Sequence, residues 1–94
     1  VHTHHHEDHV GGDPALVEGL GVEVLAPPLT VPILERYYRL PLYRRVVWGQ
    51  PGDVGSRPLG PVVRIGGQDF QVIPTPGHSR DHVCLFAPGS GWLF

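Results

Sequence analysis

The stretch that most constrains this chain is its opening "VHTHHHEDHVGG", which holds five of the 7 histidines of the sequence. A purification tag would be a uniform histidine run outside the folded sequence. Here Glu7 and Asp8 interrupt the run, and Val10, Gly11 and Gly12 follow it. Imidazole and carboxylate groups without thiolates suit zinc, iron or manganese. The stretch therefore predicts a metal site, and the fold must hold it where several side chains can meet one ion.

The spacing of these residues divides them into two pairs of ligands. In an extended backbone, residues i and i+2 point to the same side, so His4 and His6 can reach one ion while His5 points away. Asp8 and His9 follow where the chain must turn, and adjacent residues project in different directions. This difference favours a second, neighbouring ion for Asp8 and His9, with His5 as a spacer between ligands.

A second candidate stretch, "TPGHSRDH", lies far along the chain. Its Pro76-Gly77 turn directly follows the predicted strand "QVIP" and puts His78 on a loop at a strand end. His4, His6 and His78 would then form a three-histidine site with an open fourth position. An open position is typical of a catalytic rather than a structural zinc site.

Turn and periodicity signals predict an α/β arrangement of short elements. Asp13 is expected to cap a helix over "DPALVEGL" that stops at Gly21. Residues 1–6 are expected to be a strand end, and the alternating residues 22–26 a strand. Two hairpins should follow, one joining "VVRI" to "DFQVI" through a Gly-Gly turn and one joining "HVCLFA" to "GWLF" through "PGSG".

Residues 29–60 are harder to interpret. "TVPILERYYRL" favours a short helix, "PLYRRVVW" fits a helix or a strand, and "GQPGDVGSRPLGP" is a loop by composition. Basic residues among aromatic ones could bind an anionic or nucleotide-bearing substrate. We favour the alternative of a solvated helix face packed on a sheet by its apolar side. The residues concerned are Arg36, Arg39, Arg44 and Arg45, with Tyr37, Tyr38, Tyr43 and Trp48.

Charge and cysteine content limit the partners. The formal net charge is -2, which disfavours nucleic acid as the main partner, although the arginine–aromatic stretch keeps it as an alternative. Cys84 is the only cysteine, so no internal disulfide forms, as expected in a reducing compartment. No apolar run approaches the ~20 residues of a membrane span, and no signal peptide is visible. We therefore expect a cytoplasmic protein that acts on a small-molecule substrate and does not enter a membrane.

These motifs resemble those of a known family. "THHHEDHVGG" resembles the T-H-x-H-x-D-H-x-G-G signature of the metallo-β-lactamase superfamily, and "TPGHS" resembles its later T-P-G-H-[ST] motif. The resemblance implies one or two zinc ions, with iron or manganese as alternatives, and it gives Asp8 a further role in orienting the attacking water. The metal ligands that it implies are His4, His6, Asp8, His9 and His78.

The "PGHSRDH" stretch also resembles the "PGHxxGH" form of glyoxalase II-like hydrolases. His82 matches the second histidine of that form, whereas Asp81 stands where the form has glycine. We expect His82 to support a metal ligand or to contact substrate, with a plain strand residue as an equal alternative. His2 and His5 are interpreted as ordinary surface or core residues.

The resemblance implies an αββα sandwich, of which residues 1–94 would form a single partial domain truncated at both ends. In the family, a metal-bridging aspartate is due at about Phe94, and a further histidine ligand comes later. The strands that usually precede the first motif are also missing. Truncation would expose sheet edges, so we expect a homo-oligomer or pairing with another chain.

The function that follows is metal-dependent hydrolysis, in which a metal-bound hydroxide attacks an ester, thioester, lactone or similar bond. Two alternatives stay open. One is a truncated fragment that binds metal without catalysis. The other is an iron-dependent enzyme similar to the persulfide dioxygenases of the same superfamily.

Overall fold

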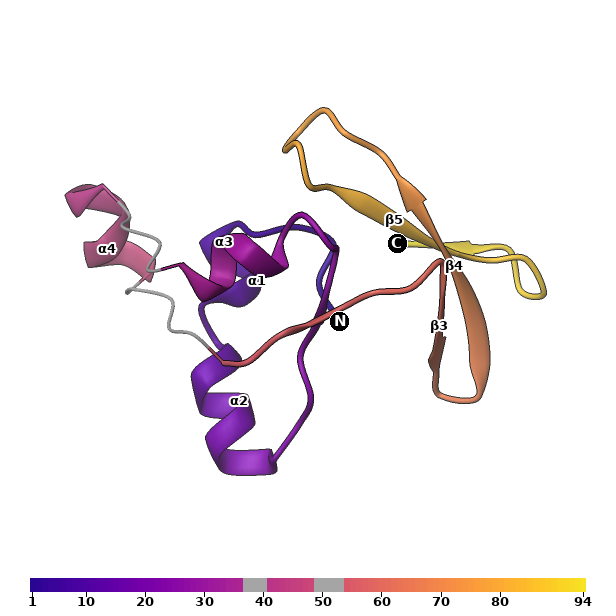
Figure 1. Cartoon of the computed structure of the whole chain (residues 1–94), viewed down its shortest axis with the longest axis horizontal. Helices are drawn as coiled ribbons and strands as arrows, with labels where there is room; N and C mark the ends of the chain where they lie inside the picture. Colours follow the sequence, from indigo (N-terminus) through magenta and orange to yellow (C-terminus); the bar gives the residue numbers. More distant parts are fainter. Residues whose placement is uncertain (37–40, 49–53) are drawn as a thin grey trace.

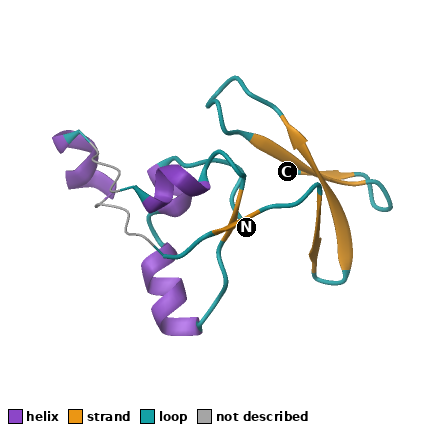
Figure 2. Ribbon diagram, in the orientation of Figure 1, coloured by secondary structure: helices purple, strands orange, loops and turns teal. Residues whose placement is uncertain are grey.

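The computed structural model describes residues 1–36, 41–48 and 54–94. Helices occupy one side of the molecule and an antiparallel sheet the other, with the N-terminal segment between them (Figure 1). The mixture of helix and strand confirms the expected α/β (α+β) class (Figure 2). The helices within the described ranges are α1 (Glu7–Val10), α2 (Asp13–Leu20), α3 (Val31–Glu35) and α4 (Leu42–Trp48).

The strands form two separate sheets. A short parallel pair joins β1 (Leu25–Ala26) to β2 (Arg57–Pro58). A four-stranded antiparallel sheet follows in the order of the sequence, and its two outer pairs confirm both predicted hairpins. Its strands are β3 (Val62–Ile65), β4 (Gln68–Pro74), β5 (Val83–Ala87) and β6 (Trp92–Leu93).

The first hairpin turns at two glycines for a conformational reason. Gly66 has a φ of 56° and Gly67 a φ of 82°. Positive φ at both central residues is the condition for a two-residue turn that matches the twist of its flanking strands, and glycine meets it at no steric cost. The turn therefore sets the register in which Val63 faces Phe70.

The predicted helix over Asp13–Leu20 is confirmed, and Gly21 ends it with a left-handed φ of 63°. The capping role predicted for Asp13 is wrong. Asp13 is the first helical residue, the N-cap is Gly12, and no side chain caps the helix. The carboxylate of Asp13 instead lies 2.7 and 2.9 Å from Nε2 of His2, which ties the N-terminal segment to α2.

The strand end expected within residues 1–6 is not formed, and the whole segment is loop. The backbone of this segment forms hydrogen bonds with two different strands instead of extending a single strand. The amide of His2 donates to the carbonyl of Leu25 at 2.8 Å, and the amide of Val83 donates to the carbonyl of Thr3 at 2.9 Å. The segment therefore bridges β1 and β5, and this crossing brings the first histidine motif to the end of the antiparallel sheet. The strand predicted at residues 22–26 is confirmed only over Leu25–Ala26.

Within the ambiguous residues 29–60, the described parts contain two helices and one short strand. The strand is β2, which lies inside "GQPGDVGSRPLGP", so the prediction of a loop there is wrong at Arg57–Pro58, where pairing with β1 extends the chain. "TVPILERYYRL" contains α3, as predicted, and "PLYRRVVW" contains α4 rather than a strand. Tyr37, Tyr38 and Arg39 lie outside the described residues, as does the side chain of Trp48. None of the described helices is long and apolar enough to cross a membrane.

The apolar interior is divided into two small clusters. On the helical side, Val10, Ala26 and Leu34 pack together with Val31. On the sheet side, the cluster consists of Phe70, Leu85 and Ala87, with Val63 and Val72 against it. The first histidine motif follows the N-terminal segment into α1, and the second lies in the loop between β4 and β5.

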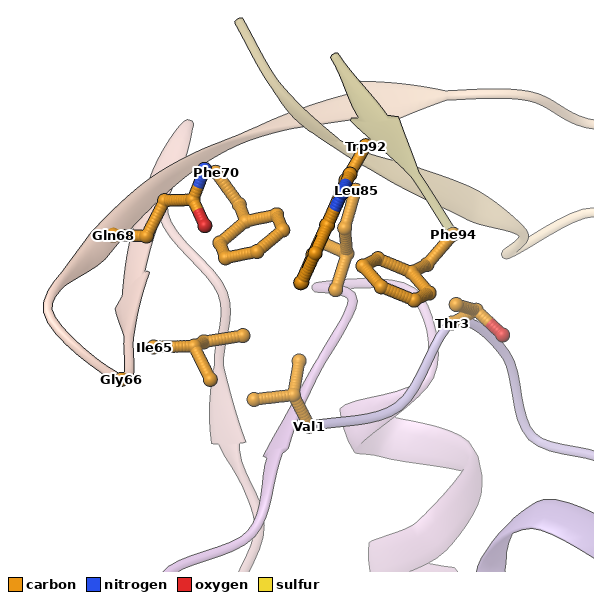
Figure 3. A pocket seen from close by; sticks show the side chains of 9 residues that line it. All are labelled: Val1, Thr3, Ile65, Gly66, Gln68, Phe70, Leu85, Trp92 and Phe94. Carbon is orange, nitrogen blue, oxygen red and sulfur yellow. The ribbon is translucent and has the colours of Figure 1, made fainter. Parts of the chain in front are cut away.

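An apolar cavity of about 690 Å³ adjoins the sheet-side cluster (Figure 3). The side chains of Phe70, Leu85, Trp92 and Phe94 gather on one side of it, and Val1 lies on the opposite side. Trp92 and Phe94 are also exposed, at 58% and 61%. The inner face of β4–β6 is therefore only partly covered by the described residues.

Candidate metal centre

Three imidazoles from two distant parts of the chain meet at one point. His4 and His6 lie in the segment before α1, and His78 lies in the turn between β4 and β5. One nitrogen from each ring lies within 4.8 Å of the other two. The ring centroids are separated by 4.6 Å for His4–His6, 4.9 Å for His4–His78 and 4.6 Å for His6–His78. The three nitrogens are close enough to bind a single ion.

Local backbone structure explains this meeting. The amides of His9 and Val10 both donate to the carbonyl of His6, so a helical turn begins immediately after the second histidine. In the second motif, the amide of Thr75 donates to the carbonyl of His82 and closes the loop that presents His78. Each motif is therefore held by its own backbone hydrogen bonds at the end of a regular element.

His4 is the deepest member of the cluster, with 3% of its surface exposed. Its Nδ1 lies 3.0 Å from the hydroxyl of Thr3, whereas its Nε2 is buried without a hydrogen-bond partner among the described residues. A buried polar atom without a partner is costly. A metal ion bound at Nε2 would remove that cost, and the donor set of three imidazoles suits a divalent transition metal.

The electrostatics of the cluster favour the neutral form of His4 and of His6. Burial, followed by repulsion from His9 and the other nearby histidines, lowers the pKa of His4 to about 4. Burial is also the main cause that lowers the pKa of His6, with His5 and His78 adding to it. Neutral imidazole is the form that binds metal, so no proton has to leave His4 near pH 7 for an ion to enter.

The structure places Asp8 and His9 beside the cluster but does not bring them into it. Both lie on α1 and are exposed, with Oδ2 of Asp8 3.8 Å from Nε2 of His9. The ring centroid of His9 is 4.3 Å from that of His4. In the described part of the chain, the one group of three or more histidine, cysteine or acidic side chains close enough to share an ion contains neither residue. A helical turn was not predicted here, and it is what directs the two side chains toward solvent.

His82 lies immediately before β5 and at the edge of the same cluster. Its Nδ1 is 2.8 Å from the hydroxyl of Thr75. Its ring centroid is 5.0 Å from that of His4 and 6.2 Å from that of His78. His82 is half-buried and oriented by Thr75, in a place where it can contact a molecule bound at the cluster.

Two residues between the ligands form interactions that their sequence did not predict. His5 was predicted to be a spacer, but its Nδ1 lies 2.8 Å from Oδ1 of Asp81. Glu7 is buried and forms an ion pair with Arg44 of α4. The only signal for the first pair was the replacement of glycine by Asp81 in the second motif. For the second pair there was none, because nothing in the sequence shows which face of α1 is buried.

The whole chain matches a known protein family. A family model described as the metallo-beta-lactamase superfamily matches residues 1–94. The chain is 36% identical over 93 residues to a hydroxyacylglutathione hydrolase of Chromohalobacter salexigens, and 34% identical over 99 residues to one of Synechococcus sp. (strain JA-3-3Ab). Each alignment covers 98% of this chain but only 29% and 31% of the relative. The chain thus spans about a third of the length of these relatives.

Two solved structures are similar over the same region. TTHA1623, crystallised in a di-iron-bound form, aligns with a TM-score of 0.69 and 34% sequence identity over 98% of this chain and 45% of its own. The BLEG-1 B3 metallo-beta-lactamase aligns with a TM-score of 0.69 and 25% identity, over 98% of this chain and 46% of its own. These similarities extend across both histidine motifs.

Proposed function

Because the chain belongs to the metallo-β-lactamase superfamily, we propose that the protein is a metal-dependent hydrolase of acyl thioesters. In this proposal His4, His6 and His78 hold one ion, with zinc as the first candidate. Asp8 and His9 contribute to a second ion when one is bound. The observation that carries the proposal is the meeting of three imidazole nitrogens within 4.8 Å around a buried, unpartnered Nε2 of His4.

The chemistry divides between the ion and the side chains. A divalent ion, when bound, lowers the pKa of water toward neutrality and polarises the bond under attack. Three imidazole ligands would leave such an ion a coordination position for water or substrate. Asp8 is exposed beside the cluster and, as a carboxylate, can accept a hydrogen bond from the attacking water. His82, oriented by Thr75, can contact the substrate.

The substrate class rests on the relatives. Proteins named hydroxyacylglutathione hydrolase align over 98% of this chain, a span that covers both of its histidine motifs. We therefore propose a hydroxyacyl thioester of glutathione as the first substrate to test. Oxygen esters and lactones are the next candidates, since attack of water on the carbonyl carbon also cleaves their acyl–oxygen bond.

The test begins with protein purified without added metal. We expect elemental analysis to find zinc, and we expect hydrolysis of a hydroxyacylglutathione to increase when zinc is added and to stop with a chelator. His6→Ala should lose both metal and turnover. His9→Ala should keep one ion per chain, because His9 lies outside the three-histidine group. Unchanged metal content in His6→Ala would refute this assignment of ligands.

An iron-dependent oxygenase similar to the persulfide dioxygenases is the second candidate. It is favoured by the similarity to TTHA1623, whose structure was solved in a di-iron-bound form. The same purified protein distinguishes the two. Bound iron, together with oxygen uptake on addition of glutathione persulfide, would replace the hydrolase proposal. Metal binding with neither activity would leave a metal-binding protein without catalysis, the third candidate.

A further inference from the structure

Asp81 is a buried charged residue outside the three-histidine cluster. Only 3% of its surface is exposed. A buried carboxylate is costly unless several donors satisfy it. Asp81 meets this condition with donors from three separate segments, which makes it the most highly connected buried polar side chain described outside the cluster.

The contacts of Asp81 divide between its two oxygens. Oδ1 accepts a hydrogen bond from the hydroxyl of Ser79 at 2.5 Å and lies 2.8 Å from Nδ1 of His5. Oδ2 accepts one from the hydroxyl of Thr30 at 2.5 Å. Burial alone would raise the pKa of Asp81, but the hydrogen bonds from Ser79, Thr30 and His5 hold it well below its ordinary value. An ionised carboxylate only accepts, so Nδ1 of His5 is the protonated nitrogen in this pair.

The donors have a common relation to the metal centre. His5 lies between His4 and His6, and Ser79 directly follows His78. Asp81 therefore joins the segment that presents two of the imidazoles to the segment that presents the third. Thr30, directly before α3 and fully buried, anchors the same carboxylate to the helical side of the molecule.

We propose that Asp81 is a positioning residue of the metal centre: through His5 and Ser79, its carboxylate sets the place of His4 and His6 relative to His78. This inference rests on the proposed function only in assuming that these three histidines bind an ion. It also gives a role to the one departure of this chain from the "PGHxxGH" pattern, where glycine could make none of these contacts.

A positioning role has a measurable consequence. Groups that orient metal ligands typically contribute about 10- to 100-fold to metal affinity. Asp81 acts one contact further out, through His5 and through the neighbour of His78, so we expect Asp81→Asn to weaken zinc binding by about tenfold. The asparagine keeps the size of the side chain but loses the charge and one acceptor.

The experiment measures zinc affinity by competition with a chromogenic chelator, and the ligand-field spectrum of bound cobalt. Asp69→Asn is the matched control, because Asp69 is exposed on β4 and its side chain pairs only loosely with Arg64 at 3.4 Å. We expect Asp81→Asn, and not Asp69→Asn, to weaken zinc binding and to shift the cobalt spectrum. A role in stability alone would change the free energy of unfolding and leave the cobalt spectrum of the folded protein unchanged, which would overturn the inference.

His5→Gln gives a second variant that is easier to fold, because the His5 side chain is partly exposed at 17%. It should weaken zinc binding in the same direction, and its effect should not add to that of Asp81→Asn in the double variant. If Asp81→Asn does not fold, unchanged zinc affinity in His5→Gln overturns the inference. Failure of the unsubstituted protein to bind zinc, iron or manganese would overturn the proposed function and this inference together. Metal binding by the unsubstituted protein that both variants retain in full would overturn this inference alone.

Discussion

At the scale of single residues, the low pKa of His4 predicts how the metal-free protein responds to acid. The folded pKa of about 4 lies below the value of 6.5 expected in the unfolded chain, so the unfolded state binds more protons between these values. The free energy of unfolding should be highest above about pH 6.5 and should fall as the pH drops toward about 4. Urea unfolding in the presence of a chelator, repeated across this pH range, measures the free energy of unfolding. His4→Gln should show a shallower fall, and an identical pH dependence would contradict the assignment.

The buried ion pair beside the metal motif predicts a difference between two adjacent arginines. Arg44 pairs with Glu7, whose side chain is 1% exposed and has a second oxygen without a partner among the described residues. Arg44→Ala should lower the free energy of unfolding by roughly 1–3 kcal/mol, because it leaves a buried carboxylate unpaired while Arg44 itself is partly exposed. Arg45, exposed on the same helix, is the control, and Arg45→Ala should change stability by less than about 0.5 kcal/mol.

Kinetics of the same two variants test whether this pair of arginines binds an anionic substrate. If Arg45 contacts substrate, Arg45→Ala should raise KM at unchanged stability. If Arg44 serves only to neutralise Glu7, Arg44→Ala should change stability more than KM. Equal losses of unfolding free energy in both variants would mean that the Glu7–Arg44 ion pair does not stabilise the fold more than an exposed arginine does.

The site residues that could be predicted from the sequence are those recognised by their spacing from nearby residues. His4 and His6 share a side because they are two positions apart, and His78 follows a turn that any Pro-Gly pair indicates. The contacts of His5 and Glu7 could not be predicted, because their partners lie 76 and 37 positions away and depend on how whole segments pack. Long-range pairing of this kind leaves no periodic signal in a single sequence.

At the scale of elements, glycine substitutions should have opposite signs in a turn and in a helix. Gly67 has a φ of 82° in the hairpin turn, so Gly67→Ala should lower the free energy of unfolding by about 1–2 kcal/mol. Gly19 lies within α2 with open space around its Cα, so Gly19→Ala should raise it by about 0.5–1 kcal/mol. Thermal or urea unfolding of the two variants measures both. Two changes of the same sign would contradict the assigned backbone geometry.

Elements with strong local signals were predictable, and elements defined by their neighbours were not. Both hairpins of the sheet were recognised by their glycine-containing turns, and α2 by Pro14 near its start and Gly21 at its end. The helical turn α1 contains only four residues, too few to show helical periodicity, and it forms because the carbonyl of His6 accepts two amides. The N-terminal segment has a strand-like sequence, but it exchanges hydrogen bonds with β1 and with the start of β5, so tertiary contacts decide its conformation.

At the scale of the whole molecule, the three-histidine site depends on a connection between two halves that each have a small core. The helical cluster around Leu34 and the sheet cluster around Phe70 share no residue. They are joined by the N-terminal segment, by the Thr30–Asp81 hydrogen bond and by the imidazoles themselves. Metal binding should therefore raise the free energy of unfolding of the whole molecule and not only order the two loops, because an ion held by His4 and His78 connects the two halves.

The partly covered face of the sheet leads to a prediction about association. Trp92, Leu93 and Phe94 are 58%, 62% and 61% exposed, and Trp92 and Phe94 line the apolar cavity (Figure 3). Contiguous exposed apolar surface of this kind promotes self-association, and β6 is in addition an edge strand of the sheet in the described part of the chain. We expect concentration-dependent association in sedimentation velocity. Trp92→Thr, which keeps the preference for strand, should weaken it by about tenfold or more, since buried tryptophans often dominate such interfaces.

Leu20→Gln is the matched control for this experiment, because Leu20 is 72% exposed on α2 and lies away from the cavity lining. A general effect of surface hydrophobicity would lower association equally in both variants. Association through the sheet would respond only to Trp92→Thr, and added zinc should leave it unchanged, because the cavity lining contains none of the three clustered histidines. A monomer at all concentrations would show that this face does not pair with a second copy of the chain.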